Sequence, residues 1–441
     1  MKCISILSAM LLLLTALPIS AQVQPDEKPM QFSLSEARSY ALDNSPILLN
    51  SARDVEIAKK RIWENTASGL PQANLNSSYA YSPELAGLSD QLGEFIPDFN
   101  PNDLKTSFLM SVQVNQLLFS GQYIVGLHAS KVYAGLSRLA DSKSKTGLTE
   151  SITNTYFTAL VARESVIILD STQAAVEKTL YETEQMFKNG FVEATDVDQL
   201  KILVSNIKST RSVATRQIEL MERMLKYQMG LPINKPVILT DNIDFLVSNM
   251  NLEAAIADSF RLEKNIDYNM LDTQEKLMKL NLQLTMAQFL PTVSGYYSYY
   301  KSLDNNFFND QSPNTFGLSL ALPLFSSGQR MSQVSQRRIE FMKAQTTKQM
   351  AAESLSLEYE TALSNYFSAQ NIYTLQKENR DLSLRIYKKS ITKFREGIGT
   401  SLDLNQTQSQ YFDAEGNYFN ALISLVSAKS RLESLLSEAE K

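Results

Sequence analysis

The feature that most constrains this chain is a long proline-free segment, Gln122 to Lys188, in which apolar side chains recur at three- and four-residue spacing. At a rise of about 1.5 Å per residue, a continuous helix over this segment would be roughly 100 Å long, taller than a single globular domain. A turn containing Gly190 follows, and a second periodic segment runs on from it. The pattern therefore predicts a long antiparallel helical hairpin.

The same design occurs again in the second half of the chain. Gln329 to Phe394 is a second proline-free stretch, and an offset of 207 residues superimposes Gly190 on Gly397 and Asp196 on Asp403. After each glycine, apolar residues follow a heptad pattern. Two tandem coiled-coil hairpins are therefore predicted.

The first 21 residues predict the compartment. Lys2 precedes an apolar run that reaches Leu17, and small residues follow before Gln22, which is the pattern of a secretory signal peptide. The only cysteine, Cys3, lies in this leader, so we expect a mature chain without disulfides or a cysteine nucleophile. Beyond this leader the sequence contains no run of about 20 apolar residues, so no transmembrane helix is predicted. A net charge of −5 argues against a nucleic-acid partner.

Two pairs of segments alternate with period two instead. Leu75 and Tyr79 face one way and Asn74 and Asn76 the other, which predicts strands with one apolar and one polar face. Such strands fit a membrane barrel or a soluble sheet; the secretory leader and the lack of a compact core favour the membrane. Four strands leave edges that lipid does not tolerate, so several chains must close a barrel. Three chains would supply twelve strands and a water-filled, porin-like passage, whereas two would leave a filled lumen, so we expect a trimer.

The repeat divides the chain into two structural units. We expect a signal peptide at 1–21, an extended lead-in at 22–33, a first repeat at 34–230, a non-helical equatorial linker at 231–251, a second repeat at 252–436 and a tail at 437–441. The first repeat is expected to contain helices over 34–70, strands over 73–82 and 107–117, and a coiled-coil hairpin over 122–230. The second is expected to contain a helix over 252–290, strands over 292–301 and 316–323, and a hairpin over 329–436.

This duplicated order, with the motif L-P-L-F-S-S-G-Q and paired G-x-x-x-x-x-D tips, resembles the TolC family of outer-membrane efflux proteins over essentially the whole mature chain. The resemblance implies a mainly α fold with a membrane β-barrel: a homotrimer with a twelve-stranded barrel in outer-membrane lipid and a periplasmic α-helical barrel. It also implies the exit duct of a tripartite efflux system, which passively conducts substrates from an inner-membrane transporter and a periplasmic adaptor (membrane fusion) protein. Alternatives are a duct for type I protein or peptide secretion, and a periplasmic coiled-coil scaffold without a pore.

The two helical tips are the candidate sites. Apolar groups and flexible glycines at exposed turns fit either ordinary helix stops or, by the resemblance, adaptor docking by Gly190, Phe191, Val192, Glu193, Gly397, Ile398, Gly399 and Leu402. Asp196 and Asp403 would stabilise helix N-termini, and the resemblance places Asp403 in a ring of carboxylates at a periplasmic gate. Gln406 stands at the second ring, where the family has an acid. Phe394 and Gly399 stand where the family has a tyrosine and an arginine, so we expect a gate that is held more weakly or differently.

Other polar and aromatic residues have ordinary interpretations. Glu84, Asp90, Glu94, Asp98 and Asp103 predict a solvated acidic loop, and Tyr79, Tyr81, Tyr297, Tyr299 and Tyr300 an aromatic girdle at the membrane interface. His128 is expected to be a packing or surface residue, and Trp63 an interhelical packing residue. No metal cluster, phosphate loop or catalytic motif is present in the sequence, so we expect neither a cofactor nor enzyme activity.

Overall fold

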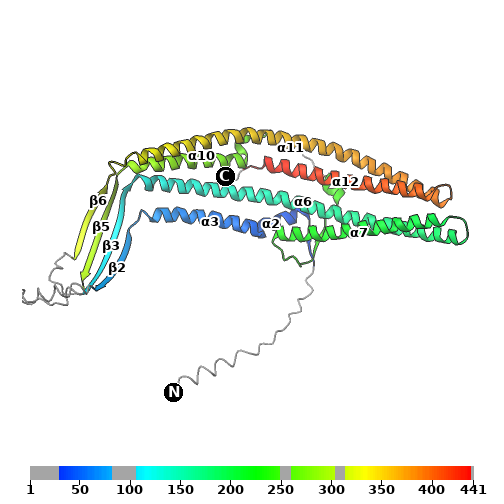
Figure 1. The fold of residues 1–441 in the computed structure, drawn as a ribbon, viewed down its shortest axis with the longest axis horizontal. Helices are drawn as coiled ribbons and strands as arrows, with labels where there is room; N and C mark the ends of the chain where they lie inside the picture. Colours follow the sequence, from blue (N-terminus) through cyan, green and yellow to red (C-terminus); the bar gives the residue numbers. More distant parts are fainter. Residues whose placement is uncertain (1–28, 82–105, 249–259, 303–312, 439–441) are drawn as a thin grey trace, which may run out of the picture.

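The computed structural model describes residues 29–81, 106–248, 260–302 and 313–438. The predicted signal peptide, the acidic loop and the start of the helix predicted over 252–290 lie outside these residues. The chain is a long curved slab of helices with a four-stranded sheet at one end (Figure 1).

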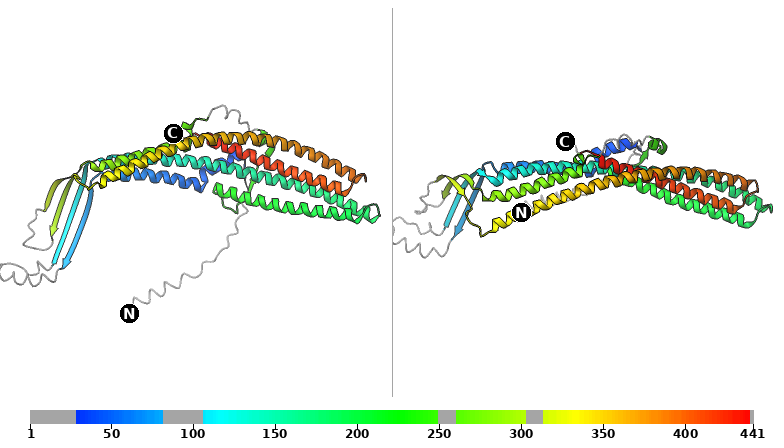
Figure 2. Two further views of the ribbon diagram at one scale, coloured as in Figure 1. Left: turned by 45° about the horizontal axis from the view of Figure 1, so that its top comes forward. Right: turned by 90° about the horizontal axis from the view of Figure 1, so that it is seen from above.

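Each half of the chain contains one long helical hairpin. In the first half, α2 (Leu34–Asn44) and α3 (Pro46–Ala67) precede the hairpin of α6 (Gly121–Lys188) and α7 (Ala194–Met229). In the second half, η1 (Leu262–Lys264), α10 (Ile266–Met286) and η2 (Ala287–Phe289) precede α11 (Gln329–Arg395) and α12 (Ser401–Leu436). The views in Figures 1 and 2 show the two hairpins side by side, with both tips at the end opposite the sheet. The proline-free heptad pattern accounts for these lengths.

The sheet has the order β2-β3-β5-β6, and all its strand pairs are antiparallel. Its strands are β2 (Gln72–Tyr81), β3 (Thr106–Ser120), β5 (Thr292–Ser302) and β6 (Asn314–Ala321). Leu75, Val112 and Tyr299 form one cross-strand row, and Asn74, Gln113 and Ser298 form the next. Because neighbouring residues of a strand point to opposite faces, these rows give the sheet an apolar and a polar face, as predicted.

The same alternation corrects one part of the aromatic prediction. Tyr297 and Tyr299 lie on the apolar face, whereas Tyr300 is paired with Ser111 and lies on the polar face. Tyr300 therefore cannot share a girdle with the other two. The last strand also differs from the range predicted over 316–323: β6 ends at Ala321, before Pro323, whose ring removes the backbone donor that a strand would need.

A small structural unit lies at the middle of the helical slab. β1 (Met30–Phe32) pairs in parallel with β4 (Val237–Leu239). Asp241 follows β4, and its Oδ2 accepts hydrogen bonds from the backbone N–H of Leu34 at 2.6 Å and from the Tyr156 hydroxyl at 3.0 Å. One carboxylate thus joins the linker, the start of α2 and α6.

Two sequence predictions around this unit are wrong. The linker predicted as non-helical over 231–251 contains α8 (Ile243–Ser248), because the Asn242 side chain accepts a hydrogen bond from the backbone N–H of Phe245 at 3.4 Å and caps a helical turn. The continuous helix predicted over 252–290 has its start outside the described residues, and it is interrupted at 260–265, where η1 precedes α10 at Ile266. Asn265 sets the start of α10 by capping Tyr268 N–H at 3.1 Å.

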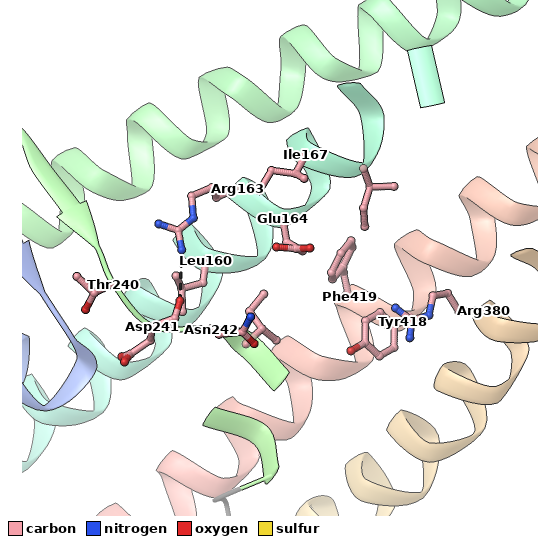
Figure 3. Close-up of a pocket in the computed structure, with 12 residues that line it drawn as sticks. Leu160, Arg163, Glu164, Ile167, Thr240, Asp241, Asn242, Arg380, Tyr418 and Phe419 are labelled. Atoms are coloured by element: carbon pink, nitrogen blue, oxygen red, sulfur yellow. Dashed lines mark hydrogen bonds between the residues drawn. The ribbon is translucent and has the colours of Figure 1, made fainter. Parts of the chain in front are cut away.

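A cavity of about 350 Å³ lies between the linker and the two hairpins (Figure 3). On the linker side, Arg163 donates hydrogen bonds to the carbonyl oxygens of Leu239 at 2.6 Å and Asp241 at 3.3 Å. On the other side, the Arg380 guanidinium lies 4.3 Å from the centre of the Tyr418 ring. Arg380 is also 3.9 Å from Glu415, which is 6% exposed. The second hairpin therefore places a charged pair beside the cavity, with Arg380 on α11 and the buried Glu415 on α12.

Replacing Glu415 with glutamine is expected to stabilise the protein at pH 8 and to have no effect near pH 4. Burial raises the pKa of Glu415. The nearby Tyr411 hydroxyl and Arg380 oppose this rise, whereas Asp381 and Glu164 add to it by repulsion. Since an acid with a raised pKa costs stability in its ionised form, the cost is absent below the unfolded pKa and complete above the folded one. We expect the thermal midpoint at pH 8 to rise by roughly 1–3 °C.

The pH profile of thermal unfolding is the measurement, with Asp413→Asn as a matched control, because Asp413 is an exposed acid on the same helix. A glutamine variant that is less stable than the parent at pH 8 would mean that the attraction of Arg380 outweighs the cost of burial.

Candidate gate and docking surface at the helical tips

The two tips have the same turn geometry. Gly190 has φ +76° and Gly397 has φ +74°, in the left-handed region that favours glycine. Beyond each glycine, the backbone N–H of Phe191 donates to the Met186 oxygen at 3.0 Å, and that of Ile398 to the Lys393 oxygen at 3.0 Å. These bonds close the last helical turns, so both long helices stop at fixed positions.

Apolar side chains are exposed at both turns. Phe191 is 77% exposed, Ile398 is 71% exposed and Leu402 is 65% exposed, while Val192 is half-buried and Glu193 is exposed. Such groups at the end of a long projection form a surface suited to a protein partner. Gly399 is different, because an added Cβ would lie 3.1 Å from the Lys393 Cβ. Its place at the tip is therefore explained by local packing.

The four residues predicted for the gate have different environments. Asp196 is half-buried: its Oδ2 accepts from the backbone N–H of Glu193 at 3.2 Å, and its Oδ1 accepts a short hydrogen bond from the Ser401 hydroxyl. Asp403 and Gln406 are exposed on the first turns of α12. Phe394 is half-buried and packs against the cluster that contains Tyr387 and Leu404. Of the two predicted acids, the Asp196 carboxylate thus accepts hydrogen bonds from its own chain, whereas the Asp403 side chain is exposed at the surface.

Sequence reasoning missed the residues that join the two hairpins. Ser401, only 4% exposed, links α12 to Asp196 of α7. Arg395 Nε lies 3.4 Å from Glu182 Oε2, and its Nη2 donates to Thr179 Oγ1 at 3.4 Å, which links α11 to α6. We call these two links the tip latch. In the sequence Ser401 is an ordinary helix-start residue and Arg395 one of several basic residues, so no local signal pointed to them.

The described part of the chain offers little else for chemistry. Its histidine, cysteine and acidic side chains form no group of three that could hold a metal ion. None of the described helices combines the length and apolar character that a membrane span requires.

Comparisons with known proteins agree with this architecture. The family described as outer membrane efflux protein matches residues 270–438. The outer membrane protein TolC of Vibrio cholerae serotype O1 is 22% identical over 405 residues, covering 88% of this chain and 87% of that protein. TolC of Escherichia coli K12 is 22% identical over 421 residues, covering 91% and 82%.

The solved structure of the outer membrane protein VceC from Vibrio cholerae has the same fold, with a TM-score of 0.71 at 15% identity, over 92% of this chain and 97% of that one. The match in sequence and in fold thus extends over both repeats, from the sheet to the tips. The chain is thus similar, in sequence and in fold, to the outer-membrane efflux proteins of the TolC family.

Proposed function

We propose that this outer-membrane protein is a trimeric channel that serves as the exit duct of a tripartite efflux system. The proposal rests mainly on the two edges of the four-stranded sheet, because each edge strand is left with one side unpaired in a single chain. Among the described strands, β2 and β6 each pair along one edge only. Open strand edges are not tolerated in lipid, so closure by further copies of the chain follows if the sheet lies in the membrane.

The helical slab supports the same closure. Apolar side chains are exposed on α3 at one side of the slab, where Ile57 and Trp63 lie, and on α11 at the other, where Met350 and Leu357 lie (Figure 1). Copies placed side by side would bury both sets. Three copies supply twelve strands, enough for a barrel with a water-filled lumen. The polar face of the sheet would line it, and the apolar face would contact lipid.

The tips complete the proposal. Exposed Phe191, Ile398 and Leu402 would receive a periplasmic adaptor, and Asp403 from each copy would contribute to a ring of carboxylates that narrows the passage and favours cations. The chain supplies no energy source, so transport through it would be passive and driven by an inner-membrane transporter. Its substrates would then be selected mainly by that transporter.

The proposal is tested on the purified full chain, by native mass spectrometry and by conductance in a planar lipid bilayer. We expect a mass of three chains and discrete, cation-preferring conductance, with the preference reduced in Asp403→Asn. Asp413→Asn is the control, since Asp413 is exposed on the same helix but farther from the tip. A monomer without conductance would favour the scaffold interpretation and overturn the channel.

A further inference from the structure

The exposed apolar surface does not stop where the strands end. It continues through the strand–helix junctions into the adjoining helical turns, and the exposed apolar residues there are Leu118, Ile124, Met286, Phe325 and Met331. Phe325 and its neighbour Leu324 are among the most exposed apolar residues of the described chain, at 87% and 88%. If the sheet lies in lipid, this band places the periplasmic edge of the hydrocarbon within about one helical turn of the junctions, roughly 5 Å.

A collar of positive charge follows directly below this band. The windows 57–62 of α3, 126–131 of α6, 279–284 of α10 and 334–339 of α11 contain no aspartate or glutamate. Their basic residues are all exposed: Lys59, Lys60, Arg61, Lys131, Lys279, Arg337 and Arg338. By helical rise these residues lie roughly 9–15 Å from the junctions. The flexible lysine stems can extend back toward the membrane and bring the ammonium groups to headgroup depth.

Four of these basic residues have no ion-pair partner among the described residues. Arg337 pairs with Glu340 at 2.7 Å, and Arg61 lies 5.5 Å from the centre of the Tyr133 ring. Lys59, Lys60, Lys131 and Lys279 have no ion pair with any described residue. About two to three helical turns farther from the membrane, Lys348 pairs with Asp272 and Glu275. The four windows thus combine exposed basic side chains with an absence of acidic residues.

We propose that this basic collar binds the anionic headgroups of phospholipids in the periplasmic leaflet of the outer membrane. The inference rests on the proposed placement of the sheet in the membrane. Phosphodiester groups at the membrane surface attract lysine and arginine side chains through their charge. Trp63, which is 63% exposed, lies one helical turn from Lys59 and Lys60 on the membrane side. Tryptophan is enriched at this depth, so the order of apolar band, tryptophan and lysines matches an interface.

The single tryptophan makes the proposal directly testable, because Trp63 is the only one in the chain. The full chain is reconstituted in phosphatidylethanolamine vesicles doped with brominated phosphatidylethanolamine or brominated phosphatidylglycerol, and the quenching of Trp63 fluorescence is measured. We expect phosphatidylglycerol to be preferred by about three- to tenfold at low salt, since each basic residue at a membrane surface favours anionic lipid about fivefold. The preference should shrink in high salt.

The variant Lys59→Gln/Lys60→Gln is expected to reduce the preference at Trp63 most, because both lysines lie one helical turn from it, and Lys131→Gln is expected to reduce it less. The matched control is Lys388→Gln/Lys389→Gln, an exposed lysine pair on α11 in the half of the slab near the tips, which should leave it unchanged.

Each other outcome is decisive. Equal quenching by the two lipids would overturn the headgroup site but leave the membrane placement intact. The absence of quenching by either lipid would contradict both. Altered ion selectivity of the Lys59→Gln/Lys60→Gln channel without a change in lipid preference would place the lysines in the lumen and overturn the proposal.

Discussion

Replacing Gly230 with alanine is expected to destabilise the folded chain by about 3 kcal/mol or more, because two costs combine. Gly230 ends α7 with φ +78°, a conformation that costs an L-residue about 1–2 kcal/mol. An added Cβ would also lie 2.4 Å from the backbone oxygen of Asn44 and 2.9 Å from Pro46 Cδ. No side-chain rotation relieves a contact with backbone, so α7 and the start of α3 would have to move apart.

Gly190→Ala is the matched control for this experiment. Gly190 has nearly the same dihedral angle, φ +76°, but no atom lies within 4 Å of an added Cβ. Only the conformational cost of about 1–2 kcal/mol then remains. Thermal unfolding of both variants, followed by circular dichroism, separates the two costs. Equal destabilisation would show that α7 does not pack closely on the α2–α3 corner.

Removal of the Ser401 hydroxyl is expected to open the channel more than removal of Arg395. The Arg395–Glu182 pair is about 40% exposed on both sides, and such pairs contribute about 0–1 kcal/mol. Ser401 is buried and donates to the Asp196 carboxylate, and a hydrogen bond to a charged group contributes about 1.5–3 kcal/mol. Loss of about 1.4 kcal/mol changes an equilibrium tenfold, so Ser401→Ala should raise the open fraction about tenfold.

Single-channel recordings in planar bilayers measure this effect. Arg395→Ala should change the open fraction by less than about fivefold, which corresponds to 1 kcal/mol. Ser409→Ala is the control, since Ser409 is exposed on the same helix. Equal open fractions in Ser401→Ala and the parent channel would mean that the tip latch does not hold the hairpins together.

Periodic features of this protein could be predicted from the sequence, because their signal is local and repeated. The long proline-free segments that end near Gly190 and Gly397, with the heptad stripes that follow each glycine, identify the two hairpins, and alternation along 73–82 identifies both faces of β2. The same alternation shows that the prediction for Tyr300 was wrong, because Tyr300 lies on the polar face and Tyr299 on the apolar face. Two consecutive tyrosines of a strand cannot share a face.

Contacts between distant segments could not be predicted. Asp241 binds the backbone of Leu34, and Ser401 binds Asp196, in each case across roughly two hundred residues of chain. A single serine or aspartate carries no periodicity that would reveal its partner. Short β1 and β4 are also too brief for a pattern, and they pair in parallel in a core that they share with Tyr156 of α6. The gate role of Asp403 and the docking role of the tips remain predictions.

The central claim is that the helical tips bind a periplasmic adaptor, and photocrosslinking at Glu193 tests it most directly. This residue is exposed beside the first turn, and the only cysteine of the chain is Cys3 in the predicted leader, so the single cysteine introduced by Glu193→Cys can be labelled selectively. Glu56→Cys, at an exposed glutamate of α3, is the matched control near the membrane. We expect mass spectrometry to identify a membrane-fusion adaptor crosslinked at position 193 and not at position 56. Efficient labelling of the Glu193→Cys variant with no adaptor adduct, or equal capture at both positions, would contradict the claim.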